Sequence, residues 1–141
     1  IGAPTLSALA ALRVGAGLAK LVMPTPILDA GLVILPSATG RTIPTDHSGG
    51  IIPHEAACVV DAVIRDCECL VIGPGLGRGD GPRAATLRAA QQEDVPVVID
   101  ADALNALSNT ATASLTIVPV NDAPVFTGVP GSQVCLFLRG V

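Results

Sequence analysis

The chain has 141 residues, half of them apolar, yet its only aromatic residues are Phe126 and Phe137. This length suits a single domain, and a composition rich in Ala, Val, Leu, Ile, Gly and Pro is typical of a buried parallel sheet covered by closely packed helices. The net charge of −4, without a cluster of Lys and Arg, argues against nucleic-acid binding. Arg13 and Lys20 interrupt the longest apolar stretch, so no membrane span is predicted.

The N-terminus and the cysteines indicate a cytoplasmic protein. The chain begins at Ile1 without a basic segment leading into an apolar one, so no secretory signal is recognised and the true start is expected to have been removed. The four cysteines show no regular framework and are expected to be reduced. His54 and Cys58 would share a helix face near Cys67 and Cys69, but the ligand spacing of a zinc site is missing, so apolar burial is the favoured interpretation.

The first part of the chain predicts two helices separated by a strand. Thr5 precedes apolar residues spaced i, i+3, i+4 and is expected to be the N-cap of a helix over 6–12, which Gly15 and Gly17 end. The expected elements that follow are a strand over 18–23, a helix over 27–35 and, within a polar loop over 36–52, a brief strand over 38–43.

From Pro53 onward the pattern is regular. The expected elements are a helix over 54–65, a strand over 68–72, a glycine-rich turn over 73–80, a helix over 82–92, a strand over 95–99, a helix over 103–107, and strands over 115–118 and 134–138. A strand, helix and strand at this spacing form a βαβ unit with parallel strands. The turn over 73–80 and the loop over 100–105 should therefore meet at the carboxyl edge of the sheet, where such sheets bind ligands.

The glycine-rich turn reads Gly-Pro-Gly-Leu-Gly-Arg-Gly from Gly73 to Gly79. Its amides could receive a phosphate at the start of a helix. It is neither the dinucleotide fingerprint, which requires glycine where Arg78 stands, nor a Walker loop. A tight turn with a purely structural role is an equal alternative.

Polar residues follow the next strand. Asp100 and Asp102 could hold a metal, a hydroxyl or a ligand ammonium, but on local sequence alone Asp102 is better explained as a helix N-cap. Asn105, on the first helical turn, could point into the same pocket or into solvent. His47 lies between Asp46 and Ser48, and we reject a catalytic triad there because triads are assembled from separate loops.

Four segments, 2–4, 12–18, 71–77 and 98–105, together resemble the NAD(P)H-hydrate dehydratases of the ribokinase-like superfamily in order and spacing. The resemblance runs from the first residue to about 107. It implies an α/β fold of three layers, αβα, with a mostly parallel sheet. Residues 1–141 are expected to be the N-terminal part of a single, incomplete domain of this kind, leaving a central strand unpaired.

The resemblance also implies a reaction in which ADP or ATP, with Mg²⁺, drives removal of water from hydrated NADH or NADPH. The ring hydroxyl would be phosphorylated and then lost as phosphate. The site residues that it implies are Ala3, Gly75 and Gly77, which match positions that hold the hydrated dinucleotide, and Asp100, Asp102 and Asn105 in the pocket wall. A homo-oligomer is expected.

The chain departs from the family pattern in two places. Residues 118–123 stand where the family has a Thr-Pro-His-Pro-Gly-Glu type motif, and they lack its His and Glu. The family's Gly-Gly-Ser/Thr-Gly-Asp turn, which carries the catalytic Asp, would lie beyond Val141, so no catalytic residue is expected within the chain. Two alternatives are a ribokinase-like vitamin or sugar kinase and a non-catalytic dinucleotide-binding remnant.

Overall fold

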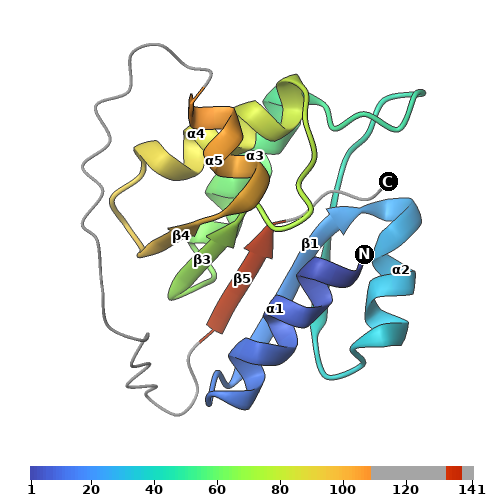
Figure 1. The fold of residues 1–141 in the computed structure, drawn as a ribbon, viewed down its shortest axis with the longest axis vertical. Helices are drawn as coiled ribbons and strands as arrows, with labels where there is room; N and C mark the ends of the chain where they lie inside the picture. Colours follow the sequence, from blue (N-terminus) through green and yellow to red (C-terminus); the bar gives the residue numbers. More distant parts are fainter. Residues whose placement is uncertain (109–132, 138–141) are drawn as a thin grey trace.

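The computed structural model describes residues 1–108 and 133–137 of the chain (Figure 1). In chain order the elements are α1 (Gly2–Arg13), β1 (Leu18–Pro24), α2 (Thr25–Ile34), β2 (Thr39–Ile43), α3 (Pro53–Ile64), β3 (Cys69–Ile72), α4 (Asp80–Gln91), β4 (Val97–Ile99), α5 (Ala101–Ser108) and β5 (Gln133–Phe137). The predicted helices and strands within these ranges are confirmed, with shifts of a few residues at their ends. The strand expected over 115–118 lies outside the described residues.

The described strands form one sheet in the order β2-β1-β5-β3-β4, and all of its pairings are parallel. Helices α1 and α2 cover one face, while α3, α4 and α5 lie on the other (Figure 1). The three-layer αβα fold is therefore confirmed. The neighbouring parallel strands β3 and β4 are joined through α4, as the predicted βαβ unit requires.

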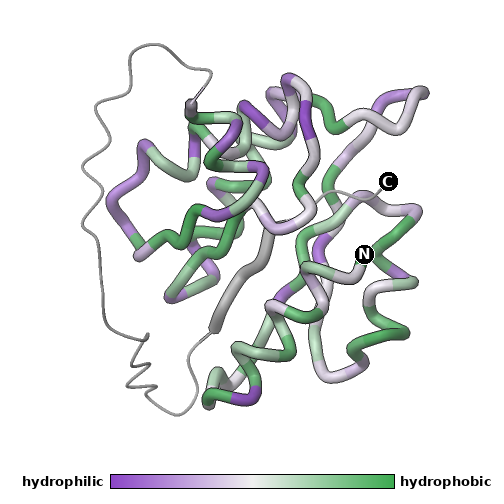
Figure 2. Tube along the Cα trace, in the orientation of Figure 1, coloured by the Kyte–Doolittle hydropathy of each residue, from purple (hydrophilic) through white to green (hydrophobic). Residues whose placement is uncertain are grey.

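Alternating side chains of the strands build two hydrophobic clusters, one on each face of the sheet. In β1, Leu21 and Met23 belong to the cluster under α1 and α2, whereas Val22 belongs to the cluster under α3 and α4. All three are fully buried, and each contributes about 1.5–3 kcal/mol through removal of apolar surface from water. In Figure 2, β3 and β4 are hydrophobic along their lengths, and hydrophilic residues gather on α4 and in the connections.

The sequence order of the strands differs from their order in the sheet. Strand β5 lies at the centre, where it pairs with β1 on one side and with β3 on the other. The β-prone segment 134–138 supplies this central strand, over Gln133–Phe137, whereas β4 lies at an edge of the described sheet and has a neighbour on one side only. On the face that carries α1 and α2, the side of β4 is less covered, and Val98 is 46% exposed.

Helix α1 begins earlier than predicted, at Gly2, so the expectation that Thr5 is its N-cap is wrong. The Thr5 hydroxyl instead donates to the carbonyl oxygens of Ile1 and Gly2, at 3.1 and 2.9 Å. A threonine hydroxyl can bond to a preceding carbonyl as readily as to a following amide, which explains the misplaced start.

The loop between β2 and α3 is organised by Asp46. The Asp46 Oδ1 accepts hydrogen bonds from the Ser48 hydroxyl at 2.7 Å and from the Ser48 and Gly50 amides at 2.8 and 2.9 Å.

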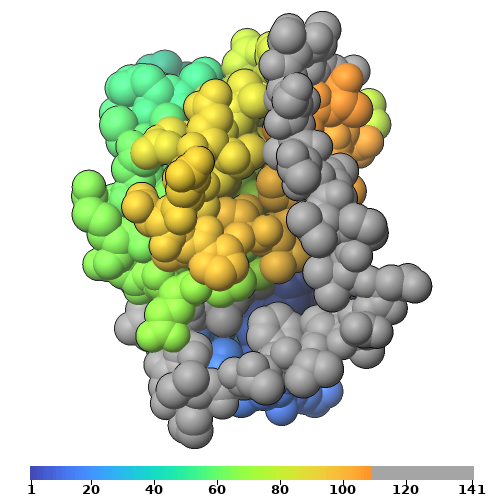
Figure 3. All heavy atoms as spheres, turned by 90° about the vertical axis from the view of Figure 1, so that its left-hand side faces the viewer, coloured from blue at the N-terminus to red at the C-terminus, as the bar shows by residue number. Residues whose placement is uncertain are grey.

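Farther along the loop between β2 and α3, the Ile51 backbone packs so closely on α4 that a side chain at Gly81 would collide with the Ile51 carbonyl. Seen from the β4 edge, α4 lies on the surface next to the residues that lead into β4 (Figure 3).

The loops that follow β3 and β4 meet at the level of their backbones. Gly73 has φ +123°, and a Cβ on it would overlap the Asp100 carbonyl oxygen and lie 2.9 Å from the Ala103 Cβ. The Asp100 amide donates to the Ile72 carbonyl at 3.0 Å, which holds the start of this loop against β3. Across residues 1–108 and 133–137, no helix is long and apolar enough to cross a membrane.

Replacement of Gly73 by Ala should lower the free energy of unfolding by about 3 kcal/mol or more, because the new Cβ adds both a left-handed backbone and a collision with Asp100. Gly15→Ala is the matched control, since Gly15 also has a positive φ, +110°, but has open space around it. Urea denaturation of both variants measures the difference. Equal losses of stability would contradict a close contact between the two loops.

The three donors around Asp46, with the Ser48 hydroxyl first, lower the pKa of its carboxyl below the ordinary value. Because the pKa is lowered on folding, the contribution of this turn to stability is present above the unfolded pKa and is lost as the pH falls through the folded pKa. Ser48→Ala should raise the pKa of Asp46 toward 3.8 in an NMR titration of its carboxyl carbon. Ser7→Ala, which removes a hydroxyl from α1, should leave that titration unchanged.

Candidate functional site

The start of α1 and the apex of the glycine-rich turn lie together at the carboxyl edge of the sheet. Helix α1 precedes β1 and packs against it, so its first turn reaches the edge where β3 ends (Figure 1). A Cβ placed on Gly75 would lie 3.6 Å from the Pro4 Cδ and 3.8 Å from the Ala3 Cβ. Ala3 and Gly75 are both exposed, so a ligand could contact both.

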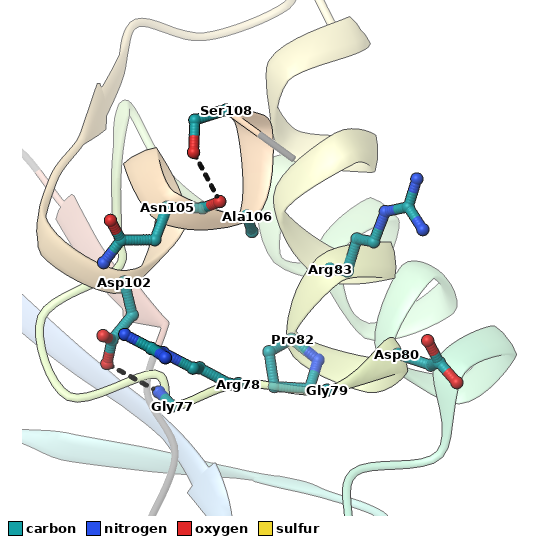
Figure 4. A pocket seen from close by; sticks show the side chains of 10 residues that line it. All are labelled: Gly77, Arg78, Gly79, Asp80, Pro82, Arg83, Asp102, Asn105, Ala106 and Ser108. Carbon is teal, nitrogen blue, oxygen red and sulfur yellow. Dashed lines mark hydrogen bonds between the residues drawn. The ribbon is translucent and has the colours of Figure 1, made fainter. Parts of the chain in front are cut away.

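A second part of the edge is a pocket of about 440 Å³ between the glycine-rich turn, α4 and α5 (Figure 4). Its lining residues are Gly77, Arg78, Gly79, Asp80, Pro82, Arg83, Asp102, Asn105, Ala106 and Ser108. Among them are three of the predicted site residues, Gly77, Asp102 and Asn105. Ala3, Gly75 and Asp100 do not line this pocket, so the predicted residues fall into two neighbouring groups joined by the turn.

Asp102 contacts the glycine-rich turn, so the interpretation of its side chain as a helix N-cap is wrong. Helix α5 already begins at Ala101, and the Asp102 Oδ2 accepts a hydrogen bond from the Gly77 amide at 2.8 Å. The Leu76 amide is also bonded, to the Gly73 carbonyl at 3.0 Å. These two amides are therefore engaged within the protein and do not point at a phosphate, as the glycine-rich sequence had allowed.

Asp100 and Asn105 are placed differently from each other. Asp100 has an exposed side chain, and its backbone packs against Gly73. Asn105 lies on α5 beside Asp102 and lines the pocket, with its side chain also exposed (Figure 4). Asn105 and Asp102 therefore line this pocket, whereas Asp100 does not line it and contacts the glycine-rich turn through its backbone.

Sequence reasoning treated Arg78 only as an interruption of the glycine pattern. The structure places its exposed side chain in the pocket, running past Gly77 toward Asp102, whereas the Arg83 side chain points away from them (Figure 4). The signal that could have found Arg78 is its position directly after Gly77, in a turn expected at the ligand-binding edge.

A smaller hollow of about 300 Å³ lies on the opposite side of the same turn, against the β2–α3 loop. Arg78, Gly79, Asp80 and Pro82 line both hollows, and Asp46 lines the smaller one. Within residues 1–108, no group of three His, Cys, Asp or Glu side chains could hold a metal ion. The local chemistry of the edge consists of backbone amides, carboxylates and arginines.

Comparison with known proteins identifies the family of the chain. The sequence pattern of the family described as NAD(P)H-hydrate dehydratase matches residues 1–127. A bifunctional NAD(P)H-hydrate repair enzyme from Salinibacter ruber is 36% identical over 110 residues, which cover 76% of this chain and 20% of that protein.

Two shorter relatives are similar in the same way. An ATP-dependent (S)-NAD(P)H-hydrate dehydratase from Vitis vinifera is 30% identical over 117 residues, covering 77% of this chain and 33% of that protein. An ADP-dependent (S)-NAD(P)H-hydrate dehydratase from Xanthomonas campestris is 32% identical over 104 residues, covering 74% and 35%. The chain thus spans at most about a third of the length of these relatives. With 127 of its 141 residues matched, the chain belongs to the NAD(P)H-hydrate dehydratase family.

Proposed function

We propose that this chain is the N-terminal part of a domain that uses ADP or ATP to remove water from hydrated NADH or NADPH. One observation supports this most directly: within a chain of this family, Ala3 and Gly75 lie together, exposed, at the carboxyl edge of a parallel sheet. Open α/β sheets bind their ligands at this edge. The names of the relatives supply the substrate and the nucleotide.

In the proposed reaction, the hydroxyl oxygen of the hydrated nicotinamide ring attacks the terminal phosphorus of the nucleotide. A P–O bond of the nucleotide breaks, giving ADP from ATP or AMP from ADP. The hydroxyl proton is released as the new O–P bond forms. The ring C–O bond then breaks and a proton leaves the neighbouring ring carbon, which restores the double bond and releases inorganic phosphate with the former hydroxyl oxygen. None of the described residues is assigned as the base.

The described residues have roles in binding the substrate or in shaping its site in this proposal. Ala3 and Gly75 contact the hydrated dinucleotide, and a side chain larger than hydrogen at position 75 would fill the space beside the first turn of α1. Gly77, Asp102 and Asn105 form one wall of the adjoining pocket, and Asp100 fixes the loop behind it.

The proposal also includes a metal ion, a cellular location and a state of assembly. The nucleotide would bring Mg²⁺ with it, because Mg²⁺ is usually held by substrate phosphates together with one or two carboxylates. No step of the reaction above is assigned to the ion. We also propose a cytoplasmic location, where the dinucleotide substrates are found, and assembly as a homo-oligomer.

The protein that carries this chain should restore the reduced-nicotinamide absorbance band of NADPH hydrate when ADP or ATP is present. The same mixture without nucleotide should stay unchanged. Both nucleotides are assayed in parallel, and phosphate release is measured alongside absorbance, because one phosphate should form for each ring restored. Dinucleotide binding without nucleotide-dependent turnover would indicate the non-catalytic module instead.

Gly75→Val should reduce turnover of NADPH hydrate by at least a hundredfold, because the side chain occupies the space next to Ala3 and Pro4 where the ligand approaches the backbone. The strained backbone alone costs about 1–3 kcal/mol of stability. Gly49→Val separates the two effects, since Gly49 has a similar φ, +81° against +69°, and lies in the β2–α3 loop. Steady-state kinetics measure the loss of turnover, and thermal melts measure the loss of stability. Equal kinetics for the two variants would count against a ligand at Gly75.

A further inference from the structure

The glycine-rich turn is held at two points by residues that follow β4, namely Asp100 and, in the first turn of α5, Asp102. At the start of the turn, Gly73 lies directly against the Asp100 backbone. Farther along the turn, the Gly77 amide donates to the Asp102 carboxylate at 2.8 Å, although the two residues are 25 positions apart in the sequence. Gly75 lies midway in sequence between these two contacts, and a Cβ on it would lie within 4 Å of Ala3 and Pro4. These two residues after β4 therefore control the position of the residue that faces the proposed ligand.

The conformation of the turn requires such support. Gly73, Gly75, Gly77 and Gly79 all have positive φ values, between +69° and +127°. Glycine reaches this region without steric cost but loses more conformational freedom on folding than any other residue. A turn with four such residues is therefore flexible unless specific bonds fix it, and the bond to Asp102 is charge-assisted, which makes it stronger than a bond between neutral groups.

The Asp102 contact also differs from what a ligand-binding carboxylate or a simple helix cap would show. One carboxylate oxygen is committed to the Gly77 amide, and α5 begins before Asp102. Alternating left- and right-handed residues create concave groups of amides that bind anions, and here the anion is a side chain of the protein itself. The Gly77 amide is thus engaged by a carboxylate of the protein itself.

We propose that Asp102 is a positioning residue: by binding the Gly77 amide, its carboxylate holds the glycine-rich turn so that Gly75 is correctly placed beside Ala3, and it does not itself contact the substrate. This proposal rests on the proposed function for the identity of the substrate. Whether Asp102 fixes the glycine-rich turn can be measured independently of enzymatic activity.

The experiment compares Asp102→Ala, Asp102→Asn and the unaltered protein. Asp94→Asn is the matched control, because it removes a carboxylate from the exposed loop before β4. The first readout is hydrogen exchange of the Gly77 and Gly75 amides by NMR. In Asp102→Ala the Gly77 exchange rate should rise roughly ten- to a hundredfold, as expected for the loss of a hydrogen bond to a charged group. In Asp102→Asn the Gly77 exchange rate should lie between those of the unaltered protein and Asp102→Ala, because the Asn amide oxygen can still accept a hydrogen bond from the Gly77 amide.

The second readout is the kinetics with NADPH hydrate. KM should rise about tenfold in Asp102→Ala, with partial rescue in Asp102→Asn and a much smaller change in kcat, because a looser turn must be ordered when the substrate binds. Asp94→Asn should match the unaltered protein in both readouts. A urea midpoint close to that of the unaltered protein shows that the changes are local.

Two outcomes would overturn the proposal. Unchanged Gly77 exchange in Asp102→Ala would show that the carboxylate does not hold the turn. A large rise in KM with unchanged Gly77 exchange would show that Asp102 contacts the substrate directly. If the unaltered protein does not turn over NADPH hydrate, the proposed function fails, and the amide exchange still decides whether Asp102 holds the turn.

Discussion

The contact between the backbones of Gly73 and Asp100 is the constraint on which the ligand-binding edge depends. Strands β3 and β4 are parallel neighbours, so the loops at their carboxyl ends leave the sheet side by side and must share a narrow space. Glycine is needed at position 73 because a Cβ would overlap the Asp100 carbonyl oxygen. Once the loops are this close, Asp102 can reach the Gly77 amide, and the pocket between α4 and α5 takes its shape.

Much of the fold could be predicted from the sequence because its signals are local. Apolar runs bounded by Gly and Pro gave the strands, and their spacing gave the βαβ unit and the meeting of two loops at one edge. The start of α1 was misplaced because the Thr5 hydroxyl can bond in two directions. The central place of β5 was missed because strand order depends on pairing between distant segments, which no local pattern records.

The sequence offered candidate residues for the site but not their arrangement. The resemblance to a family identified Ala3, Gly75 and the residues around Asp102, and the structure divides them between the first turn of α1 and the pocket beside α5. The partner of Asp102 could not be inferred from the sequence. An Asp at this position suits a helix N-cap and a hydrogen bond to a residue 25 positions away equally well. Arg78 was missed for a related reason: its importance comes from lining both hollows beside the turn.

The central position of β5 has a consequence for the order in which the fold forms. Among the described strands, β1 pairs with β2 and β3 pairs with β4, but the two pairs are joined by backbone pairing only through β5. During synthesis, the two pairs leave the ribosome well before residues 133–137, so each can assemble only its own part of the sheet. The sheet becomes continuous in a late, long-range step, and long-range pairing of this kind slows folding. Until that step, the inner edges of β1 and β3 are open to other strands, including those of neighbouring nascent chains.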